Sequence, residues 1–203
     1  MLLQFLNDLD TQVFLFLNSI HSPLFDEIMF WISHKFTWVP LYVFFLFLLV
    51  KKHKINALWI LLTVALLITL SDQSSVMIKN SVQRLRPCHN EDLKLLVHLV
   101  NGKCGGKFGF VSSHASNSFA LAAFLMPFFR IYWKYFSVAL IIWATMVSYS
   151  RIYLGVHYPG DILAGALLGV MLGILIYRLL AKFVPRIISS HNRLTSPDDN
   201  RIS

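Results

Sequence analysis

Long apolar runs separated by short polar stretches make up most of this chain. Five runs are long enough, or nearly so, to cross a bilayer, and they cover about residues 36–50, 55–78, 113–130, 134–151 and 158–180. A helix needs about 20 apolar residues to span the hydrocarbon layer. The apolar residues fill each run and do not alternate with polar ones, which disfavours a β-barrel. We therefore predict an all-α integral membrane bundle of about five transmembrane helices.

The segment before the first run has a different pattern. Between Leu9 and Ser33, apolar clusters are interrupted by Asp10, Asn18 and Asp26, and a His-Ser-Pro sequence divides the segment. Amphipathic helices of this kind lie in the membrane interface with their apolar face in lipid. We predict two short interfacial helices here and no span.

Composition agrees with a membrane protein and suggests how the chain is divided. Of the 203 residues, 56% are hydrophobic and 14% are charged, which lies outside the usual range of soluble domains. We expect an amphipathic interfacial segment at 1–35, a transmembrane domain at 36–186 and a polar, disordered tail at 187–203.

The formal net charge of +8 raises the question of nucleic-acid binding. No Lys- and Arg-rich run interleaved with aromatic residues occurs, so we exclude nucleic acid as a partner. In membrane proteins, basic residues gather instead in cytoplasmic loops. With five spans, three basic clusters fall on one side: Lys51 to Lys54; Arg130 and Lys134; Arg178, Lys182 and Arg186. That side is predicted to face the cytoplasm.

Four basic residues break this rule because they fall on the outer side: Lys79, Arg84, Arg86 and Arg151. Ionisable groups at membrane depth usually line a functional site. Three polar clusters at the outer ends of the predicted helices are therefore candidate parts of one site.

The first cluster runs from Lys79 to Pro87. A spacing of seven residues corresponds to two helical turns, so Lys79 and Arg86 are predicted to point the same way from one helix that ends at Pro87. Taken alone, this cluster is better explained by basic side chains that reach from a helix end to the interface.

The second cluster surrounds His114 at the start of the third run. Ser112 or Ser113 is a suitable N-cap, and the backbone N–H groups of the first helical turn can bind an anion. The alternative is an ordinary capped helix with a histidine at the interface.

The third cluster contains Arg151, His157 and Asp161. Asp161 follows His157 by four residues at the start of the last run, so it can reach back to the imidazole. A purely structural His–Asp pair is the alternative. Considered together, however, the cations and histidines of the three clusters would repel one another unless an anion bound between them. Phosphate fits, because Arg donates two parallel hydrogen bonds and Lys adds a point charge.

Together these residues resemble the three-part signature of the type 2 phosphatidic acid phosphatase (PAP2) family, which shares its core with vanadium haloperoxidases. The matching residues are Lys79, Arg86 and Pro87; Ser112, Ser113 and His114; and Ser150, Arg151, His157 and Asp161. One difference is that the family's Pro-Ser-Gly-His reads Val-Ser-Ser-His here, which removes a rigid Pro and adds a Cβ beside the anion. Every ionisable position is kept, so we expect this difference to alter the properties of the site without abolishing its activity.

The resemblance implies a role for each of these residues. His157 would attack phosphorus with its tautomer set by Asp161, and His114 would act as general acid and then as general base. The phosphate oxygens would be bound by Lys79, Arg86, Ser112, Ser113 and Arg151. The resemblance implies no metal ion and no cofactor.

Two further features have open interpretations. Asp72, seven residues before Lys79, would either pair with a cation inside the bundle or face a polar gap. Cys88 and Cys104 lie in the outer loop, where they would form a disulfide in an oxidising compartment or remain two thiols. The glycine-rich composition of this loop favours the bridge, because the loop would otherwise be mobile.

A site at the membrane face favours a lipid phosphate or pyrophosphate as substrate, with a phosphohistidine intermediate. The family includes enzymes for phosphatidic acid, phosphatidylglycerol phosphate, undecaprenyl pyrophosphate and lipid A 1-phosphate, and the short five-span form favours the last two. We expect a bacterial cytoplasmic (inner) membrane protein with its site facing the periplasm or cell exterior. A lipid phosphotransferase and a non-enzymatic membrane protein are the alternatives, and the oligomeric state is left open.

Overall fold

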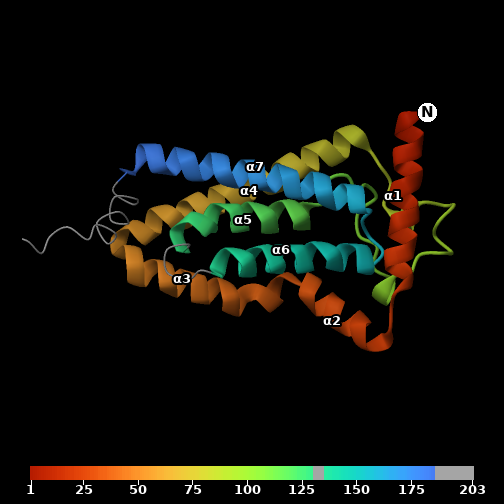
Figure 1. Cartoon of the computed structure of the whole chain (residues 1–203), viewed down its shortest axis with the longest axis horizontal. Coiled ribbons are helices and arrows are strands. Elements are labelled where there is room, and N and C mark those ends of the chain that lie inside the picture. Colours follow the sequence, from red (N-terminus) through yellow and green to blue (C-terminus); the bar gives the residue numbers. More distant parts are fainter. Residues whose placement is uncertain (130–134, 186–203) are drawn as a thin grey trace, which may run out of the picture.

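The computed structural model describes residues 1–129 and 135–185, and its regular elements are helices (Figure 1). The α-helices are α1 (Leu2–Ser19), α2 (Pro23–Ser33), α3 (Val39–His53), α4 (Ala57–Val82), α5 (Ser113–Phe129), α6 (Phe136–Tyr153) and α7 (Pro159–Phe183). Short 3₁₀ turns lie at η1 (Lys35–Trp38), η2 (Lys54–Asn56), η3 (Pro87–His89) and η4 (Val100–Gly102). The basic residues Arg130, Lys134 and Arg186, and the tail 187–203 that we predicted to be disordered, lie outside the described residues.

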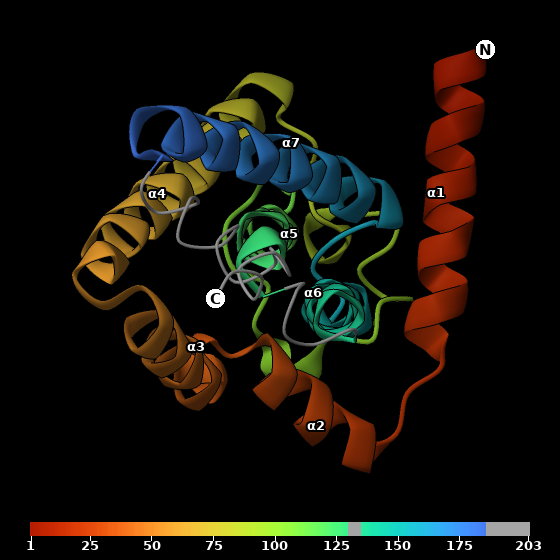
Figure 2. The ribbon, with the colours of Figure 1, turned by 60° about the vertical axis from the view of Figure 1, so that its left-hand side comes forward.

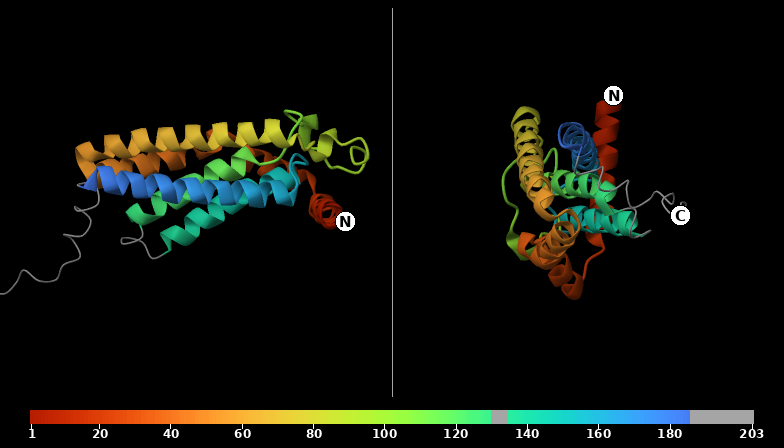
Figure 3. Two further views of the ribbon diagram at one scale, coloured as in Figure 1. Left: turned by 90° about the horizontal axis from the view of Figure 1, so that it is seen from above. Right: turned by 90° about the vertical axis from the view of Figure 1, so that its left-hand side faces the viewer.

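Helices α3 to α7 run along the long axis of the molecule, whereas α1 lies across one end (Figure 1, Figure 3). Three described stretches are long and apolar enough to cross a membrane: Lys35–Val82, Phe136–Tyr153 and Pro159–Phe183. The first of them contains both α3 and α4, which reverse direction near Lys54. Helix α5 lies in the middle of the bundle, packed against α4, α6 and α7 (Figure 2). The predicted all-α bundle is confirmed.

The turn between α3 and α4 and the C-terminal end of α7 both lie at the end of the bundle away from α1 (Figure 1). These segments carry the basic cluster Lys51 to Lys54 and the residues Arg178 and Lys182. The described residues belong to two of the three basic clusters, and they lie at one end of the bundle, as the five-span interpretation requires.

The prediction for the end of α4 was wrong. The helix stops at Val82 because Gln83 adopts a left-handed conformation with φ of 55°, so Arg86 does not share a helical face with Lys79. Beyond this turn the chain is extended. Arg86 N donates to Lys107 O at 3.1 Å, and Gly109 N donates to Arg84 O at 2.8 Å. The segment that carries Arg86 is thereby tied to the end of the outer loop.

The N-terminal segment forms two helices that break at the His-Ser-Pro sequence, as predicted. Helix α1 is amphipathic: it turns Phe14 and Asn18 inward and exposes an apolar stripe. The stripe follows the three- and four-residue spacing of one helix face and consists of Leu2, Leu6, Leu9, Val13, Phe16 and Ile20. This face suits the lipid interface.

Asn18 fastens α1 to the bundle. Its side chain is only 1% exposed, and Nδ2 donates to the carbonyl oxygens of His98, Ile152 and Tyr153 at 3.0, 3.2 and 2.9 Å. Its Oδ1 accepts from His98 N at 2.8 Å. Asn18 thereby caps the C-terminal end of α6 and ties α1 to the outer loop at His98.

Helices α5 and α7 approach each other unusually closely through a row of small residues. Gly165, Gly169 and Gly173 lie four residues apart and therefore on one face of α7. A Cβ atom at these positions would lie 2.6, 2.2 and 2.5 Å from the backbone oxygens of Ser112, Ser116 and Ala120, respectively. Only glycine allows this contact, which resembles the small-residue packing of membrane helices in general.

The glycine row gives a stability prediction. Gly169→Ala should push α7 away from α5 and lower the free energy of unfolding by about 1–3 kcal/mol, the usual range for overpacking a tight contact. Thermal unfolding of the detergent-solubilised protein measures the effect. Gly106→Ala is the matched control, because a Cβ there meets nothing within 4 Å. Equal midpoints for the two variants would contradict the close-contact interpretation.

Candidate active site

The three predicted clusters meet at the end of the bundle next to α1. They come from the end of α4 with the outer loop, from the start of α5, and from the loop between α6 and α7. Helix α5 starts short of the outer ends of α4, α6 and α7, so its first turn lies recessed among them (Figure 1, Figure 3). Lys79 and Asp161, which are 82 positions apart in sequence, are thereby brought to the same end of the bundle, around the first turn of α5, and we call this place the recess.

His157 and Asp161 form a buried pair. His157 Nδ1 lies 3.2 Å from Asp161 Oδ2, and the two side chains are 2% and 0% exposed. The same Oδ2 accepts a hydrogen bond from Tyr158 N at 3.1 Å. A Cβ at Gly109 would lie 2.8 Å from this oxygen, so the outer loop passes directly over the pair. The geometry fixes both the carboxylate and the imidazole ring.

The surroundings of His157 keep its imidazole neutral. Burial is the largest reason that the pKa of His157 lies well below its usual range, and Arg86, Arg151 and Lys79 lower it further. A hydrogen bond with the backbone of Gly109 opposes this shift but is a smaller effect. A neutral imidazole has a lone pair, which is the form that can act as a nucleophile.

Lys79 is held by serines of two helices. Its Nζ donates to Ser113 Oγ and lies 3.5 Å from Ser75 Oγ, while the two hydroxyls share a hydrogen bond of 2.6 Å. Ser113 occupies the position at which the PAP2 pattern has Gly. The side chain of Ser113 therefore has a structural function: it links Lys79 of α4 to the first turn of α5.

Arg86 is held by the outer loop. Its Nη1 donates to Cys104 O at 2.8 Å and its Nε donates to Phe108 O at 3.2 Å. Cys88 and Cys104 are joined by a disulfide, with their Cα atoms 5.9 Å apart. The bridge closes the loop whose carbonyl oxygens orient the guanidinium of Arg86.

Arg151 contacts the N-terminal segment. Its Nη1 donates to Ser33 Oγ at the end of α2, while its Nε is buried without a hydrogen-bond partner among the described residues. The contribution of Ser33 was missed from the sequence, because no local pattern signals a bond across this separation. Arg84 was also given no role, although its place among the outer basic residues was a signal. Its Nη1 lies 3.1 Å from Asp161 Oδ1.

Ser112 and His114 stand at the start of α5. Ser112 is the N-cap: its carbonyl oxygen accepts from Ser116 N at 3.0 Å and its Oγ from Ala115 N at 3.5 Å. Because Ser112 is 0% exposed and its N–H donates to Asp161 O at 3.0 Å, it holds α5 against α7. This geometry gives Ser112 a structural role as the helix cap and as a link between α5 and α7.

His114 lies within electrostatic range of the other charged groups. The groups that interact electrostatically with its imidazole are Arg151, His157, Arg86 and Lys79. Two histidines and three cations therefore share one recess, in which His157 pairs with the carboxylate of Asp161. Such an arrangement is suited to a dianionic group like phosphate. In residues 1–129 and 135–185, no three His, Cys, Asp or Glu side chains are grouped so that they could hold a metal ion.

An apolar cavity of about 680 Å³ extends from this recess into the bundle. At the outer end it is lined by Ser113, His114 and Asp72, so Asp72 faces a polar gap. Along α5 the lining continues through Leu121 to Leu125, one helical turn after another. The remaining lining residues of α3 and α4 are mainly aliphatic or aromatic. The cavity has room for a flexible apolar chain.

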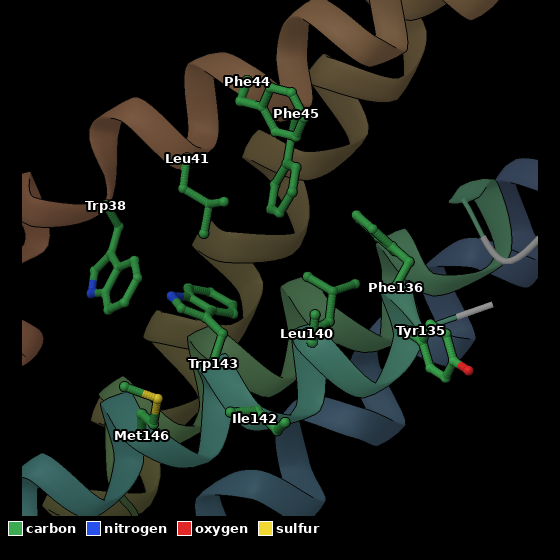
Figure 4. A pocket seen from close by; sticks show the side chains of 11 residues that line it. Trp38, Leu41, Phe44, Phe45, Tyr135, Phe136, Leu140, Ile142, Trp143 and Met146 are labelled. Atoms are coloured by element: carbon green, nitrogen blue, oxygen red, sulfur yellow. The ribbon is translucent and has the colours of Figure 1, made fainter. Parts of the chain in front are cut away.

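A second apolar cavity, of about 710 Å³, lies between α3 and α6 (Figure 4). Trp38, Phe45 and Trp143 line both cavities and thus form the wall between them. None of the three predicted clusters contributes a residue to the second cavity. Of these two cavities, the first is the one that joins the recess to the hydrophobic interior.

Comparison with known proteins agrees with this geometry. The sequence profile of the PAP2 superfamily matches residues 56–185. A lipid A 4'-phosphatase from Bacteroides thetaiotaomicron is 44% identical over 191 residues, which cover 93% of this chain and 84% of that protein. A lipid A 4'-phosphatase from Porphyromonas gingivalis is 37% identical over 182 residues, covering 87% and 75% of the two chains.

Two solved structures share the fold. The transmembrane PAP2 type phosphatidylglycerolphosphate phosphatase from Bacillus subtilis has a TM-score of 0.66 and 25% identity, with 88% of this chain and 87% of that one covered. LpxE from Aquifex aeolicus has a TM-score of 0.62 and 25% identity, with 84% and 95% covered. The similarity therefore includes the membrane-spanning architecture and not only the three motifs.

The bridge between Cys88 and Cys104 gives a direct test. Alkylation of the unfolded but unreduced protein should modify no thiol, and prior reduction should expose two, as mass spectrometry would reveal. Cys104→Ser should lower the free energy of unfolding by about 3 kcal/mol, because an open loop gains entropy in the unfolded chain. Two modified thiols before reduction would exclude the bridge.

Proposed function

We propose that this chain, which belongs to the PAP2 superfamily and is a membrane phosphatase, hydrolyses the phosphate monoester of a lipid through a phosphohistidine intermediate. One observation carries the proposal: two histidines and three cations lie together at the outer end of an apolar cavity. The cations bind the phosphate while the cavity accepts an apolar chain of the same molecule. A water-soluble phosphate ester would leave the cavity unused.

His157 is the nucleophile in this proposal. Its Nδ1 faces Asp161 Oδ2 at 3.2 Å, so the proton resides on Nδ1 and the lone pair on Nε2 attacks phosphorus. A P–N bond forms as the P–O bond to the lipid breaks. Lys79, Arg86 and Arg151 stabilise the charge that spreads over the remaining phosphate oxygens.

His114 moves the protons. In the first step it donates a proton to the departing lipid oxygen, so that the lipid leaves as an alcohol. In the second step His114 accepts a proton from water, whose oxygen attacks the phosphohistidine. The P–N bond breaks, inorganic phosphate departs and His157 regains its neutral form. His114 lies in the first turn of α5 and His157 in the loop just before α7, and the close packing of α5 against α7 keeps the two histidines in place for these steps.

The relatives favour a phosphorylated glycolipid as substrate. Two proteins that match most of this chain are lipid A 4'-phosphatases, which supports a lipid A phosphate over the undecaprenyl pyrophosphate considered from the sequence. They also favour the 4'-phosphate over the 1-phosphate. Release of inorganic phosphate from a panel of lipid phosphates, including both monophosphorylated forms of lipid A, tests the choice. Release in the absence of an acceptor lipid separates hydrolysis from phosphate transfer.

We further propose that the site faces the periplasm of a bacterial cell. The support is the position of the basic residues at the end of the bundle opposite to the recess, because this end is favoured in the cytoplasm. A lipid phosphate in the outer leaflet of the inner membrane would then reach the recess while its chains stay in the bilayer.

Replacement of the two histidines tests the mechanism. His157→Ala should abolish phosphate release and remove the acid-labile phosphoenzyme, and His114→Ala should slow release by at least about 100-fold. His21→Ala is the matched control, since this exposed histidine of the N-terminal segment should leave turnover unchanged. Full turnover of well-folded His157→Ala and His114→Ala would refute the assignment.

The cavity predicts a chain-dependent effect. Val64→Trp should fill part of the cavity and raise KM for a long-chain lipid phosphate at least about tenfold, which is about 1.4 kcal/mol, without affecting a short-chain analogue. Leu66→Trp is the control on the same helix, because Leu66 is 53% exposed at the outer surface of the bundle. An equal effect of Val64→Trp on both substrates would argue against chain binding in the cavity.

A further inference from the structure

Arg84 occupies an unusual place beside the proposed nucleophile. Its Nη1 lies 3.1 Å from Asp161 Oδ1 and 2.7 Å from Asp10 Oδ2, so one nitrogen bridges two carboxylates. Asp161 is 0% exposed, and Asp10 is 15% exposed. A buried carboxylate is stable only when hydrogen bonds and opposite charge compensate for lost solvation. Arg84 supplies that charge to Asp161.

Further contacts orient the guanidinium group of Arg84. Its Nη2 donates to Asn7 Oδ1 at 2.9 Å, and its central carbon lies 4.0 Å from the ring centre of Tyr158. The backbone is fixed as well, because Arg84 O accepts from Gly109 N at 2.8 Å. Both Nη atoms thus bind side-chain oxygens of Asp10, Asn7 and Asp161. The guanidinium group therefore supports the His157–Asp161 pair and is not oriented to bind phosphate.

Asp10 ties this arrangement to α1. Besides pairing with Arg84, its Oδ1 accepts a hydrogen bond from Gly160 N at 2.7 Å, in the first turn of α7. The N-terminal helix therefore touches the start of the helix that carries Asp161. The two carboxylate oxygens of Asp161 have separate partners. Oδ1 accepts from Arg84, whereas Oδ2 lies beside His157 Nδ1 and accepts from Tyr158 N.

We infer that Arg84 and Asp10 are positioning residues for the His157–Asp161 pair. Arg84 keeps Asp161 ionised and holds its carboxylate so that Oδ2 accepts the Nδ1 proton of His157, and Asp10 holds Arg84 in place from α1. The inference rests on the proposed function, in which His157 attacks through Nε2. It gives Asp10 of helix α1 a supporting role in catalysis, which acts through the two ion pairs of Arg84.

Four variants of the full-length protein test this inference. Arg84→Gln removes the charge and Arg84→Lys keeps it. Asp10→Asn removes the partner charge but keeps an oxygen for Gly160 N. Asp8→Asn makes the same change at an exposed position of α1 and is the matched control. The readouts are kcat, KM for a lipid phosphate, inhibition by inorganic phosphate, the melting temperature, and the tautomer of His157 from ¹⁵N chemical shifts.

Arg84→Gln should lower kcat about 10- to 100-fold, the range typical when an outer partner of a reacting group is lost. KM and inhibition by phosphate should stay within about twofold, because Arg84 does not bind the phosphate. Asp10→Asn should lower kcat by a smaller factor, Arg84→Lys should restore most of it, and Asp8→Asn should match the wild type. The Nδ1–H tautomer of His157 should dominate in the wild type and decline in Arg84→Gln.

Several results would overturn the inference. An unchanged kcat in Arg84→Gln would do so, as would a raised KM with weaker phosphate inhibition, which would make Arg84 a phosphate ligand. If the loss of kcat in Asp10→Asn only matched a loss of folded protein, Asp10 would have a structural role and no positioning role. If the wild type released no phosphate from any lipid, the proposed function would fail, and the tautomer of His157 in Arg84→Gln would still decide the role of Arg84.

Discussion

The close packing of α5 against α7 is the contact on which the rest of the structure depends. Gly165, Gly169 and Gly173 leave no side chain between the two backbones, so the helices can approach until their surfaces interlock. At the outer end of this contact, Ser112 N donates to Asp161 O at 3.0 Å. The bond joins the first turns of the two helices and sets the relative position of His114 and the His157–Asp161 pair.

A second constraint is the concentration of positive charge in the recess. Lys79, Arg86 and Arg151 lie close enough to lower the pKa of His157 together, so they also repel one another. Neutral oxygen atoms hold the three cations in separate positions. Lys79 and Arg151 donate to serine hydroxyls, and Arg86 donates to carbonyl oxygens of the outer loop. Such partners orient the cations without neutralising them, which leaves their charge available to an anion, as the proposed function requires.

Three residues of the N-terminal segment make contacts that support the site. Asn18 caps the end of α6, Ser33 binds Arg151, and Asp10 binds both Arg84 and the first turn of α7. The opposite face of α1 is apolar and suited to the lipid interface. One helix thus presents an apolar face on one side and contacts the surroundings of His157 on the other. The cavity below His114 connects the polar recess with the apolar interior of the bundle.

Much of this protein was determined by its sequence alone. Uninterrupted apolar runs require helices in lipid, and the three polar clusters name the charged residues of the site, because ionisable groups are rare at membrane depth. Local rules did not extend to contacts between distant segments. The left-handed Gln83 took Arg86 off the predicted helix, and Ser112 became a helix cap, while Ser113 gained a partner in Lys79. Arg84, Asp10 and Ser33 acquired their roles only when tertiary packing brought α1, α2 and the outer loop together, since a hydrogen bond between remote residues leaves no periodic trace in the chain.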